Sequence, residues 1–239
     1  MPEVDVMAFG AHPDDIEICC GGTLIKLADA GRAIVLVDMV RGELGTRGTA
    51  EIRQVEAAAA AKVIGAVARE NLGLEDGFVH VSEESRRQVA EVVRRHRPRL
   101  ALVPYHEGRH PDHYRASEVA YEGIFLAGLA RYDTGQEPYR PERLIYYPTT
   151  YQFEPTFVVD VSAQFLERKL EAIFCYATQV NPAAGSYPQT RLTSPAFRTR
   201  LTQRMGYYGS LIGAEYGEAF RVRGMLAVGD PLQLSFSSF

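Results

Sequence analysis

Short, almost unbroken apolar runs alternate with longer stretches of helical periodicity along the first half of the chain. The runs are Val4–Phe9, Ala33–Met39 and Leu100–Val103, with a weaker one at Glu70–Leu74. Continuous apolar runs of this length are typical of strands that are buried on both faces of a parallel sheet. Between them we expect helices that end near Gly31, Gly65 and Pro98. This alternation of strand and helix predicts an α/β fold with a mainly parallel sheet.

One of these helices has a clear apolar stripe. Thr49 can cap it, and the apolar residues that recur on one helical face are Ile52, Val55, Ala59 and Val63. We expect this face to be buried. Arg53 lies in the first turn, beside that face and close to the preceding glycine-rich loop.

The second half of the chain continues with weaker patterns. They predict a helix at Ala116–Leu129, strands at Leu144–Tyr147 and Phe157–Val161, a helix at Phe165–Tyr176 and a last helix from Ser194 to about Ile212. At 239 residues the chain fits one domain. We expect residues 1–130 to form the core that carries the candidate site, and residues 131–239 to complete the fold.

Composition narrows the class of partner. The net charge of −4 gives no reason to expect nucleic acid or an anionic membrane surface. No apolar run reaches the roughly eighteen residues of a membrane span, and the first residues lack the regions of a signal peptide. Three cysteines do not make a disulfide framework. We therefore expect a cytoplasmic protein that acts on a small molecule.

Two similar turns carry most of the candidate chemistry. His12-Pro13-Asp14-Asp15 follows the first apolar run, and His110-Pro111-Asp112-His113 follows Leu100–Val103. Because ligands bind at the carboxyl ends of parallel strands, we expect the two turns to face one another there. A single turn of this kind is weak evidence, since Asp and Pro are common in turns. Two of them, each after a strand, indicate a metal site.

The residue types and spacing favour zinc. A catalytic zinc ion takes three protein ligands and leaves one position open. His12 and Asp15 are three residues apart, as are His110 and His113. The most economical assignment makes His12, Asp15 and His113 the ligands of one zinc ion per chain, with Asp14 as general base and His110 as acid or oxyanion stabiliser. Spacing alone does not decide whether Asp14 or His110 protonates the leaving amine.

The glycine-rich loop Gly42–Gly48 allows a different interpretation. It could hold a phosphate, but it matches neither G-x-x-x-x-G-K-[ST] nor G-x-G-x-x-G. A nucleotide-binding regulatory domain is therefore the weaker alternative, and it leaves both His-Pro-Asp turns without a role.

These motifs together resemble the LmbE/PIG-L family of zinc-dependent N-acetylglucosaminyl deacetylases. The similar segments are Phe9–Asp15, Gly21-Gly22-Thr23-Leu24, Arg41–Gly48 and His110–His113. Their spacing, with Gly206–Gly213 and Tyr216–Phe220 near the C-terminus, is similar to the bacillithiol-biosynthesis branch.

This resemblance implies a Rossmann-like three-layer α/β/α sandwich and, in this branch, often a homohexamer. It implies the same three zinc ligands, Asp14 as base, His110 as its charged partner and Arg53 as a substrate contact. Some relatives also place a tyrosine near the metal, whereas here Gly108 stands two residues before His110.

The family branch implies N-acetylglucosaminyl-malate as substrate, and nearby arginines agree with it. Arg109 precedes His110, Arg53 follows the glycine-rich loop, and Arg47 lies within that loop. Arginine can bind the two malyl carboxylates through paired, charge-assisted hydrogen bonds, although Arg47 is equally compatible with a partner inside the protein. Glu43 is a further candidate substrate contact. A deacetylase of another amino sugar and a thiol-conjugate amidase remain alternatives.

Overall fold

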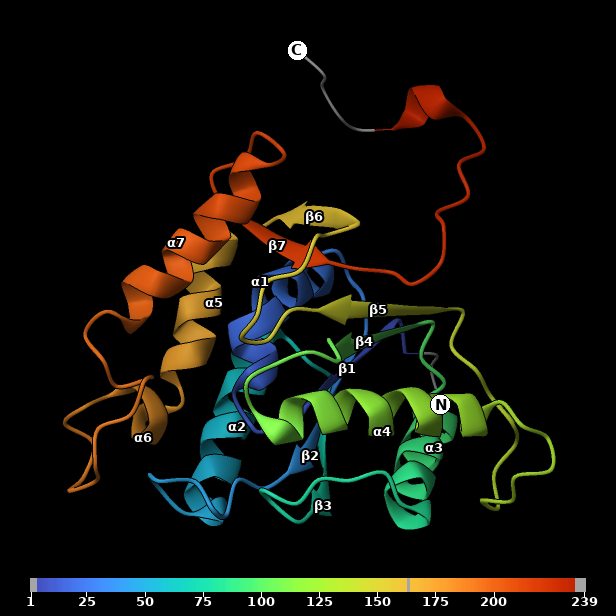
Figure 1. Ribbon diagram of the computed structural model, residues 1–239, viewed down its shortest axis with the longest axis horizontal. Helices are drawn as coiled ribbons and strands as arrows, with labels where there is room; N and C mark the ends of the chain where they lie inside the picture. Colours follow the sequence, from blue (N-terminus) through green and yellow to red (C-terminus); the bar gives the residue numbers. More distant parts are fainter. Residues whose placement is uncertain (1–3, 163, 235–239) are drawn as a thin grey trace.

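A five-stranded, wholly parallel sheet forms the centre of the molecule (Figure 1). The computed structural model describes residues 4–162 and 164–234. The strands are β1 (Val6–Gly10), β2 (Ile34–Val40), β3 (Ala68–Leu74), β4 (Leu100–Pro104) and β5 (Arg143–Tyr147). Their order in space is β3-β2-β1-β4-β5. Strands β2 and β3 lie on one side of β1, and β4 and β5 lie on the other, so the strand order switches direction between β1 and β4. Parallel sheets of this kind bind ligands in the crevice at the carboxyl ends of the strands beside such a switch point.

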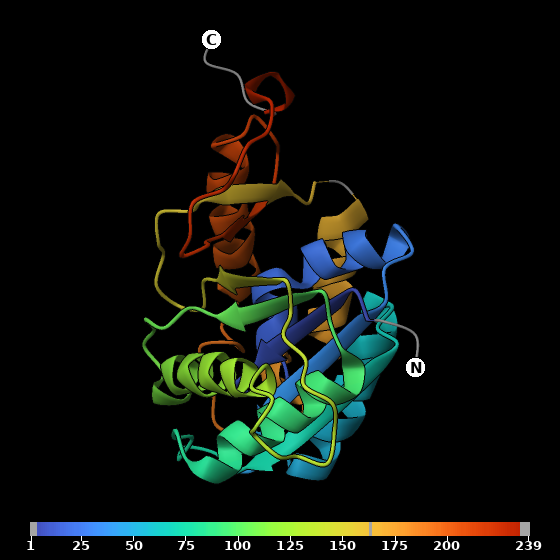
Figure 2. The ribbon, with the colours of Figure 1, turned by 90° about the vertical axis from the view of Figure 1, so that its right-hand side faces the viewer.

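Helices cover both faces of the sheet, as Figures 1 and 2 show. They are α1 (Asp15–Asp29), α2 (Ala50–Ile64), α3 (Glu83–His96), α4 (Pro111–Ala127), α5 (Gln164–Phe174), the short α6 (Ala177–Val180) and α7 (Phe197–Ser210). Because side chains alternate along a strand, Val6 and Ala8 of β1 pack with α1 and α2, whereas Met7 and Phe9 pack with α3 and α4. The expected three-layer α/β/α architecture is confirmed.

Helix α4 and strand β7 (Gly217–Phe220) differ from the sequence-based expectation. Helix α4 begins at Pro111 rather than Ala116, because proline suits the first helical position and His110 caps the helix. Strand β7 was not expected, and it pairs antiparallel with β6 (Phe157–Asp160) in a separate small sheet. None of the helices formed by the described residues has the length and apolar character needed to cross a membrane.

The prediction that the apolar face of α2 is buried is wrong. Ile52 is 40% exposed and Val55 is 71% exposed. The buried face consists instead of Arg53, Glu56, Ala57, Ala60, Ala61 and Ile64. The small alanines let α2 pack closely, and the charged residues are buried because they have partners: Glu56 accepts hydrogen bonds of 2.7 Å from the backbone and hydroxyl of Thr178.

A buried ion pair links the small sheet to α1. Helix α1 is kinked at Cys20, whose φ of −140° and ψ of 15° are not helical. Beyond the kink, Glu218 of β7 accepts hydrogen bonds from the backbone N–H groups of Gly22 (3.0 Å) and Thr23 (2.7 Å). Lys169 of α5 lies 2.5 Å from the same carboxylate and is 1% exposed. Helix α1, helix α5 and strand β7 therefore meet at the buried Glu218 carboxylate.

Replacing Lys169 with methionine is expected to lower the free energy of unfolding by about 3–5 kcal/mol, because the Glu218 carboxylate stays buried without its cation. Chemical denaturation measures the change. Lys62→Met, at an exposed position of α2, is the matched control and should change stability by no more than about 0.5 kcal/mol. Equal stability of the two variants would contradict a structural role for the Lys169–Glu218 pair.

Candidate active site

The two His-Pro-Asp turns share one backbone hydrogen bond at the carboxyl ends of adjacent strands. In the first, the backbone N–H of Asp15 donates to the carbonyl of His12 (3.2 Å). In the second, the N–H of His113 donates to the carbonyl of His110 (3.1 Å). Since β1 and β4 are neighbours in the sheet, the turns lie together, and each leads into a helix. The sequence-based expectation that they share one edge agrees with this arrangement.

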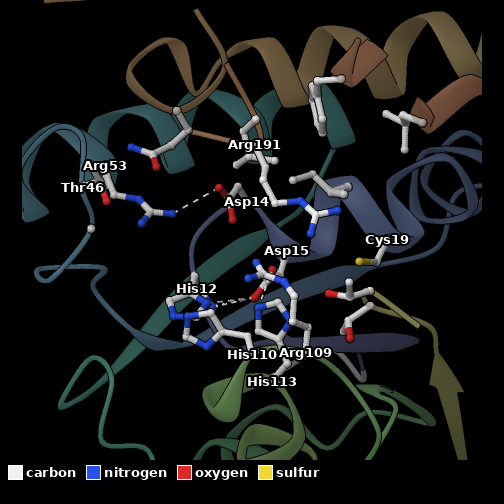
Figure 3. A pocket seen from close by; sticks show the side chains of 18 of the residues that line it. His12, Asp14, Asp15, Cys19, Thr46, Arg53, Arg109, His110, His113 and Arg191 are labelled. Carbon is white, nitrogen blue, oxygen red and sulfur yellow. Dashed lines mark hydrogen bonds and ion pairs between the residues drawn. The ribbon is translucent and has the colours of Figure 1, made fainter. Parts of the chain in front are cut away.

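Asp15 lies between two imidazoles (Figure 3). His12 Nδ1 is 3.3 Å from Asp15 Oδ2, and His113 Nε2 is 3.2 Å from Asp15 Oδ1. A donor atom from each of the three residues lies within 4.8 Å of the others, and all three residues line one cavity. The structure therefore brings together the three residues expected to hold a metal.

The donor set and its spacing fit zinc. Ligand bonds of about 2.0–2.1 Å in a tetrahedral site separate neighbouring ligand atoms by roughly 3.3 Å. Each imidazole nitrogen lies at about this distance from one oxygen of Asp15, His12 Nδ1 from Oδ2 and His113 Nε2 from Oδ1. Two imidazoles and one carboxylate also match the ligand chemistry of catalytic zinc sites, which keep a position open towards a cavity.

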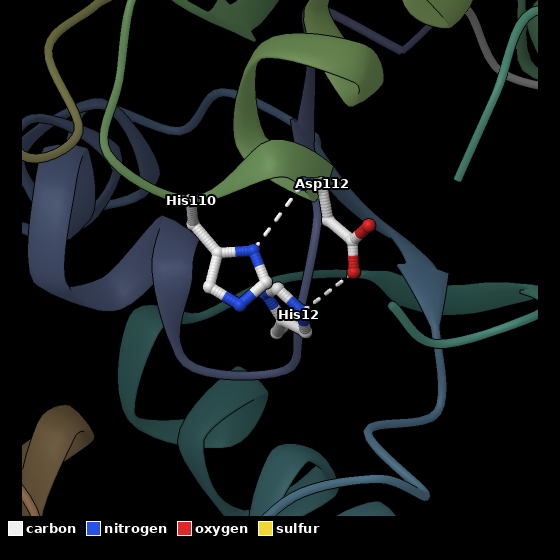
Figure 4. A group of neighbouring side chains, drawn as sticks. All are labelled: His12, His110 and Asp112. Atoms are coloured by element: carbon white, nitrogen blue, oxygen red, sulfur yellow. Dashed lines mark hydrogen bonds and ion pairs between the residues drawn. The ribbon is translucent and has the colours of Figure 1, made fainter. Parts of the chain in front are cut away.

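A second trio, His12, His110 and Asp112, also places its donor atoms close together (Figure 4). The carboxylate of Asp112 already accepts hydrogen bonds from the backbone. Asp112 accepts hydrogen bonds from the backbone N–H groups of Gly77 (2.8 Å) and Val79 (3.3 Å), and it is 1% exposed. Asp112 does not line the cavity, whereas all three members of the first trio do.

Carboxylates surround His12 on both sides of its ring. His12 Nε2 is 3.2 Å from Asp76 Oδ1 and 3.3 Å from Asp112 Oδ2. Burial alone would lower the pKa of His12, but the bonds to Asp112, Asp15 and Asp76 outweigh it and raise that pKa well above its ordinary value. For Asp15, burial acts to raise the pKa, but His113 and His12 hold it well below the usual range. Carboxylates beyond a ligand histidine fix its orientation in this way.

Sequence reasoning missed Asp76. It follows β3 at the same edge of the sheet, so the rule that located the two turns could have located it as well. Its Oδ2 accepts a hydrogen bond from the backbone N–H of Leu44 (2.9 Å), while Oδ1 faces His12. Leu44 lines the cavity as part of the glycine-rich loop. Asp76 therefore connects this loop to the candidate metal centre.

Asp76→Asn is expected to weaken zinc binding by about ten- to a hundredfold, because an amide cannot accept from both His12 and Leu44 as the carboxylate does. Competition with a chelator of known affinity measures the change. Glu75→Gln removes the neighbouring, exposed carboxylate and should leave the zinc affinity unchanged. Unchanged affinity in Asp76→Asn would show that Asp112 alone orients His12.

Asp14 is held in a strained and buried position at the start of α1. Its φ of 126° lies in a region that residues other than glycine rarely adopt. Its Oδ2 is 3.3 Å from Arg53 Nη2, and Arg53 also donates to the carbonyl of Pro13. Burial raises the pKa of Asp14 to about 7, against the opposing charge of Arg53. A carboxylate with this pKa can exchange a proton near neutral pH.

His110 presents a neutral imidazole. Its Nδ1 accepts a hydrogen bond from the backbone N–H of Asp112 (3.2 Å), so the proton of the neutral ring resides on Nε2. Burial, together with the positive charges of His12 and His113, lowers the pKa of His110. This direction disagrees with the expectation of a positively charged His110, and it favours a neutral Nε2–H donor.

The candidate substrate residues separate into two groups. Arg53 and Arg109 line the cavity, whose volume is about 530 Å³. Glu43 does not line it, and its Oε1 instead accepts from the backbone N–H of Asp76 (3.2 Å). A substrate contact of Glu43 therefore has no support in the structure.

Arg47 has an internal role. It is 1% exposed, and its guanidinium donates to five backbone carbonyls, those of Thr178, Asn181, Ala184, Tyr187 and Pro188. Of the two roles considered for Arg47, the structure supports a partner inside the protein. Its position in the loop gave no signal for this, because the partners are backbone groups from a distant segment.

Threonine and arginine side chains from the C-terminal half also line the cavity. Thr149, directly after β5, is 5% exposed, and its Oγ1 has no hydrogen-bond partner within residues 4–162 and 164–234. No tyrosine from those residues lines the cavity. Sequence reasoning missed Thr149, although it follows a predicted strand at the same edge of the sheet. It also missed the arginines at positions 191, 200 and 204, because the motifs gave no register for the segments that carry them.

Comparison with known proteins agrees with this geometry. A family model described as GlcNAc-PI de-N-acetylase, PIG-L, matches residues 7–124, which contain both His-Pro-Asp turns. The diacetylchitobiose deacetylase of Thermococcus kodakarensis is 29% identical over 234 residues, which cover 90% of this chain and 82% of that protein.

Solved structures extend the similarity to nearly the whole chain. A conserved protein from Thermus thermophilus is 35% identical with a TM-score of 0.85, over 95% of this chain and 98% of that chain. The diacetylchitobiose deacetylase of Pyrococcus horikoshii is 28% identical with a TM-score of 0.80, over 92% of this chain and 84% of that chain. The chain therefore belongs to the PIG-L/LmbE family of de-N-acetylases.

Proposed function

We propose that this protein is a zinc-dependent hydrolase that removes the acetyl group from an N-acetylglucosamine conjugate, and that the conjugate is N-acetylglucosaminyl-malate. The observation that carries the proposal is the convergence of His12, Asp15 and His113 at a cavity wall that also holds Asp14. Membership of a de-N-acetylase family supports the reaction class. Two similar proteins named diacetylchitobiose deacetylases support an N-acetylated amino sugar as substrate.

His12, Asp15 and His113 would hold the zinc ion. When bound, the ion supplies a water of lowered pKa, near 7, and polarises the amide carbonyl. Asp14 lies next to Asp15 in the chain and accepts the proton of the attacking water. Arg53 keeps the Asp14 carboxylate in place through their 3.3 Å contact.

His110 donates its Nε2–H to the developing oxyanion. Its hydrogen bond from the Asp112 N–H fixes the ring and leaves Nε2 as the donor. The carboxyl group of Asp14, once it has taken up the proton of water, can protonate the leaving amine, whereas His110 could do so only in its imidazolium form. A neutral donor performs the first task without placing a further positive charge beside the zinc ion that His12 and His113 would hold.

The malyl aglycone is proposed because of the cation that adjoins the catalytic histidine. Arg109 lines the cavity, and its guanidinium makes no hydrogen bond or ion pair with any residue in the described ranges 4–162 and 164–234. A neutral sugar needs no such group, whereas a carboxylate binds it with paired, charge-assisted hydrogen bonds. The similarity of the motif spacing to the bacillithiol branch supports the same aglycone.

Acetate release from a panel of conjugates tests the proposal. We expect kcat/KM to be highest for N-acetylglucosaminyl-malate, lower for N,N′-diacetylchitobiose and lowest for free N-acetylglucosamine. A preference for diacetylchitobiose would assign this chain the activity of its named relatives instead. Absence of acetate release from every zinc-loaded reaction would contradict the deacetylase proposal.

The remaining family expectations concern assembly and location. The branch resemblance predicts a homohexamer in the cytoplasm, and light scattering of the purified chain measures the assembly directly. The exposed apolar side chains of Ile52 and Val55 on α2 are compatible with a contact between copies. A monomeric mass at micromolar concentration would contradict the hexamer.

A further inference from the structure

The cavity has more positive charge than its own acids can neutralise. Five arginines line it, at positions 53, 109, 191, 200 and 204, against three aspartates, at positions 14, 15 and 76. Each aspartate already has a partner: Asp14 pairs with Arg53, Asp15 with two histidines and Asp76 with His12. The other four arginines therefore have no carboxylate partner among the described residues that line the cavity.

Arg191 is the best placed of these four, because its backbone is fixed. The turn that carries it is closed by a 2.8 Å hydrogen bond from the Thr190 N–H to Thr193 Oγ1. Arg200 of α7 donates to the carbonyl of Arg191 at 3.0 Å. The segment just before the turn is held by the five hydrogen bonds of the buried Arg47. Arg47 thus acts on this side of the cavity indirectly, by holding the loop that precedes Arg191.

The Arg191 guanidinium points into the cavity from the segment before α7, as Figure 3 shows, whereas Arg109 enters from the β4–α4 turn. Within residues 4–162 and 164–234, the side chain of Arg191 forms no hydrogen bond and no ion pair. Arg200 uses one of its donors on the Arg191 carbonyl and keeps others free. Two walls of the cavity therefore present unpaired guanidinium groups.

We propose that Arg191 and Arg200 form a carboxylate-binding subsite, across the cavity from Arg109, that selects substrates with a dicarboxylate aglycone. This inference rests on the proposed deacetylase function and deepens it, by adding specificity residues from the C-terminal segment. Guanidinium groups of like charge repel one another, and an anion between them removes the repulsion. Two carboxylates, one towards each wall, fit this distribution better than one compact anion does.

The test compares substrates across matched variants. Arg191→Ala is expected to reduce the ratio of kcat/KM for N-acetylglucosaminyl-malate to that for N,N′-diacetylchitobiose by about ten- to a hundredfold, mainly through KM. Arg191→Lys should recover only part of the ratio, because lysine cannot bind a carboxylate in a bidentate manner. Arg198→Ala, an exposed arginine of α7 that does not line the cavity, is the control and should keep the parent ratio.

Three outcomes would overturn the subsite. A parallel loss of activity on both substrates in Arg191→Ala would show a structural role. An unchanged ratio of the two kcat/KM values in Arg191→Ala would show that the Arg191 side chain is solvated and does not contact the substrate. A parent that prefers N-acetylglucosamine 1-phosphate to the malate conjugate would show that the subsite takes a phosphate rather than a dicarboxylate.

A binding measurement separates this inference from the proposed function. Malate alone is titrated calorimetrically into the zinc-loaded parent and into Arg191→Ala, without any turnover. We expect binding to the parent that weakens about tenfold or more in the variant. Equal binding would overturn the subsite even if the parent deacetylates conjugates. Absence of acetate release together with Arg191-dependent malate binding would instead contradict only the deacetylase proposal.

Discussion

His113→Ala is expected to abolish stoichiometric zinc binding and deacetylase activity together. The variant leaves Asp15 with one imidazole neighbour in place of two, and the remaining pair offers too few protein donors for a zinc site. His113 lies in the first turn of α4 but does not cap it, since His110 has that role. The helix should therefore form normally. Elemental analysis of the purified variant, together with acetate release, measures both effects.

His80→Ala provides the matched control. His80 is exposed, and its Nδ1 contacts only the carbonyl of Phe78 (2.9 Å). This variant should keep about one zinc ion per chain and the parent activity. Full zinc content in His113→Ala would contradict the assignment of His113 as a zinc ligand. Loss of the zinc in both variants would point to a general change in the fold.

Much of the fold could be predicted because the central sheet is parallel and covered on both faces. Strands such as β1 and β2 are buried along their whole length, so their apolar runs are continuous and easy to recognise. The face of α2 could not be predicted from hydrophobicity. Arg53 and Glu56 are buried because each has a charged or hydrogen-bonding partner distant in the chain. The pattern of apolar residues carries no information about such partners, so it predicted that the exposed Ile52 and Val55 would be buried.

The candidate site divides in the same way. The two His-Pro-Asp turns are local motifs after adjacent parallel strands, so their convergence follows from topology. Thr149 follows the parallel strand β5, so the same rule could have located it, whereas Arg191 and Arg200 come from later segments, where no parallel strand fixes the register. Arg47 shows a related limit. Its type and place in a glycine-rich loop are compatible with a ligand contact, whereas only the folded chain reveals the five carbonyls around it.

Asp14→Asn should retain zinc and lose activity by about a hundredfold or more, because the amide cannot accept the proton of water. The substitution preserves size, and asparagine tolerates a positive φ better than most residues, so the turn at φ 126° should persist. Zinc content and acetate release in the same preparation measure the two properties. Activity within a few-fold of the parent would exclude Asp14 as the base.

The pH dependence tests the environment of Asp14. Burial raises the pKa of Asp14 to about 7, while Arg53 acts to lower it. Since the base must be deprotonated, kcat/KM of the parent should fall with decreasing pH below a midpoint at or below about 7, because a bound cation lowers the pKa further. Arg53→Gln removes one opposing charge, so the acid limb should move to higher pH. Arg41→Gln, at an exposed position outside the active-site cavity, should leave the limb in place. If Arg53→Gln instead raises KM and leaves the limb unmoved, Arg53 binds substrate rather than positioning Asp14.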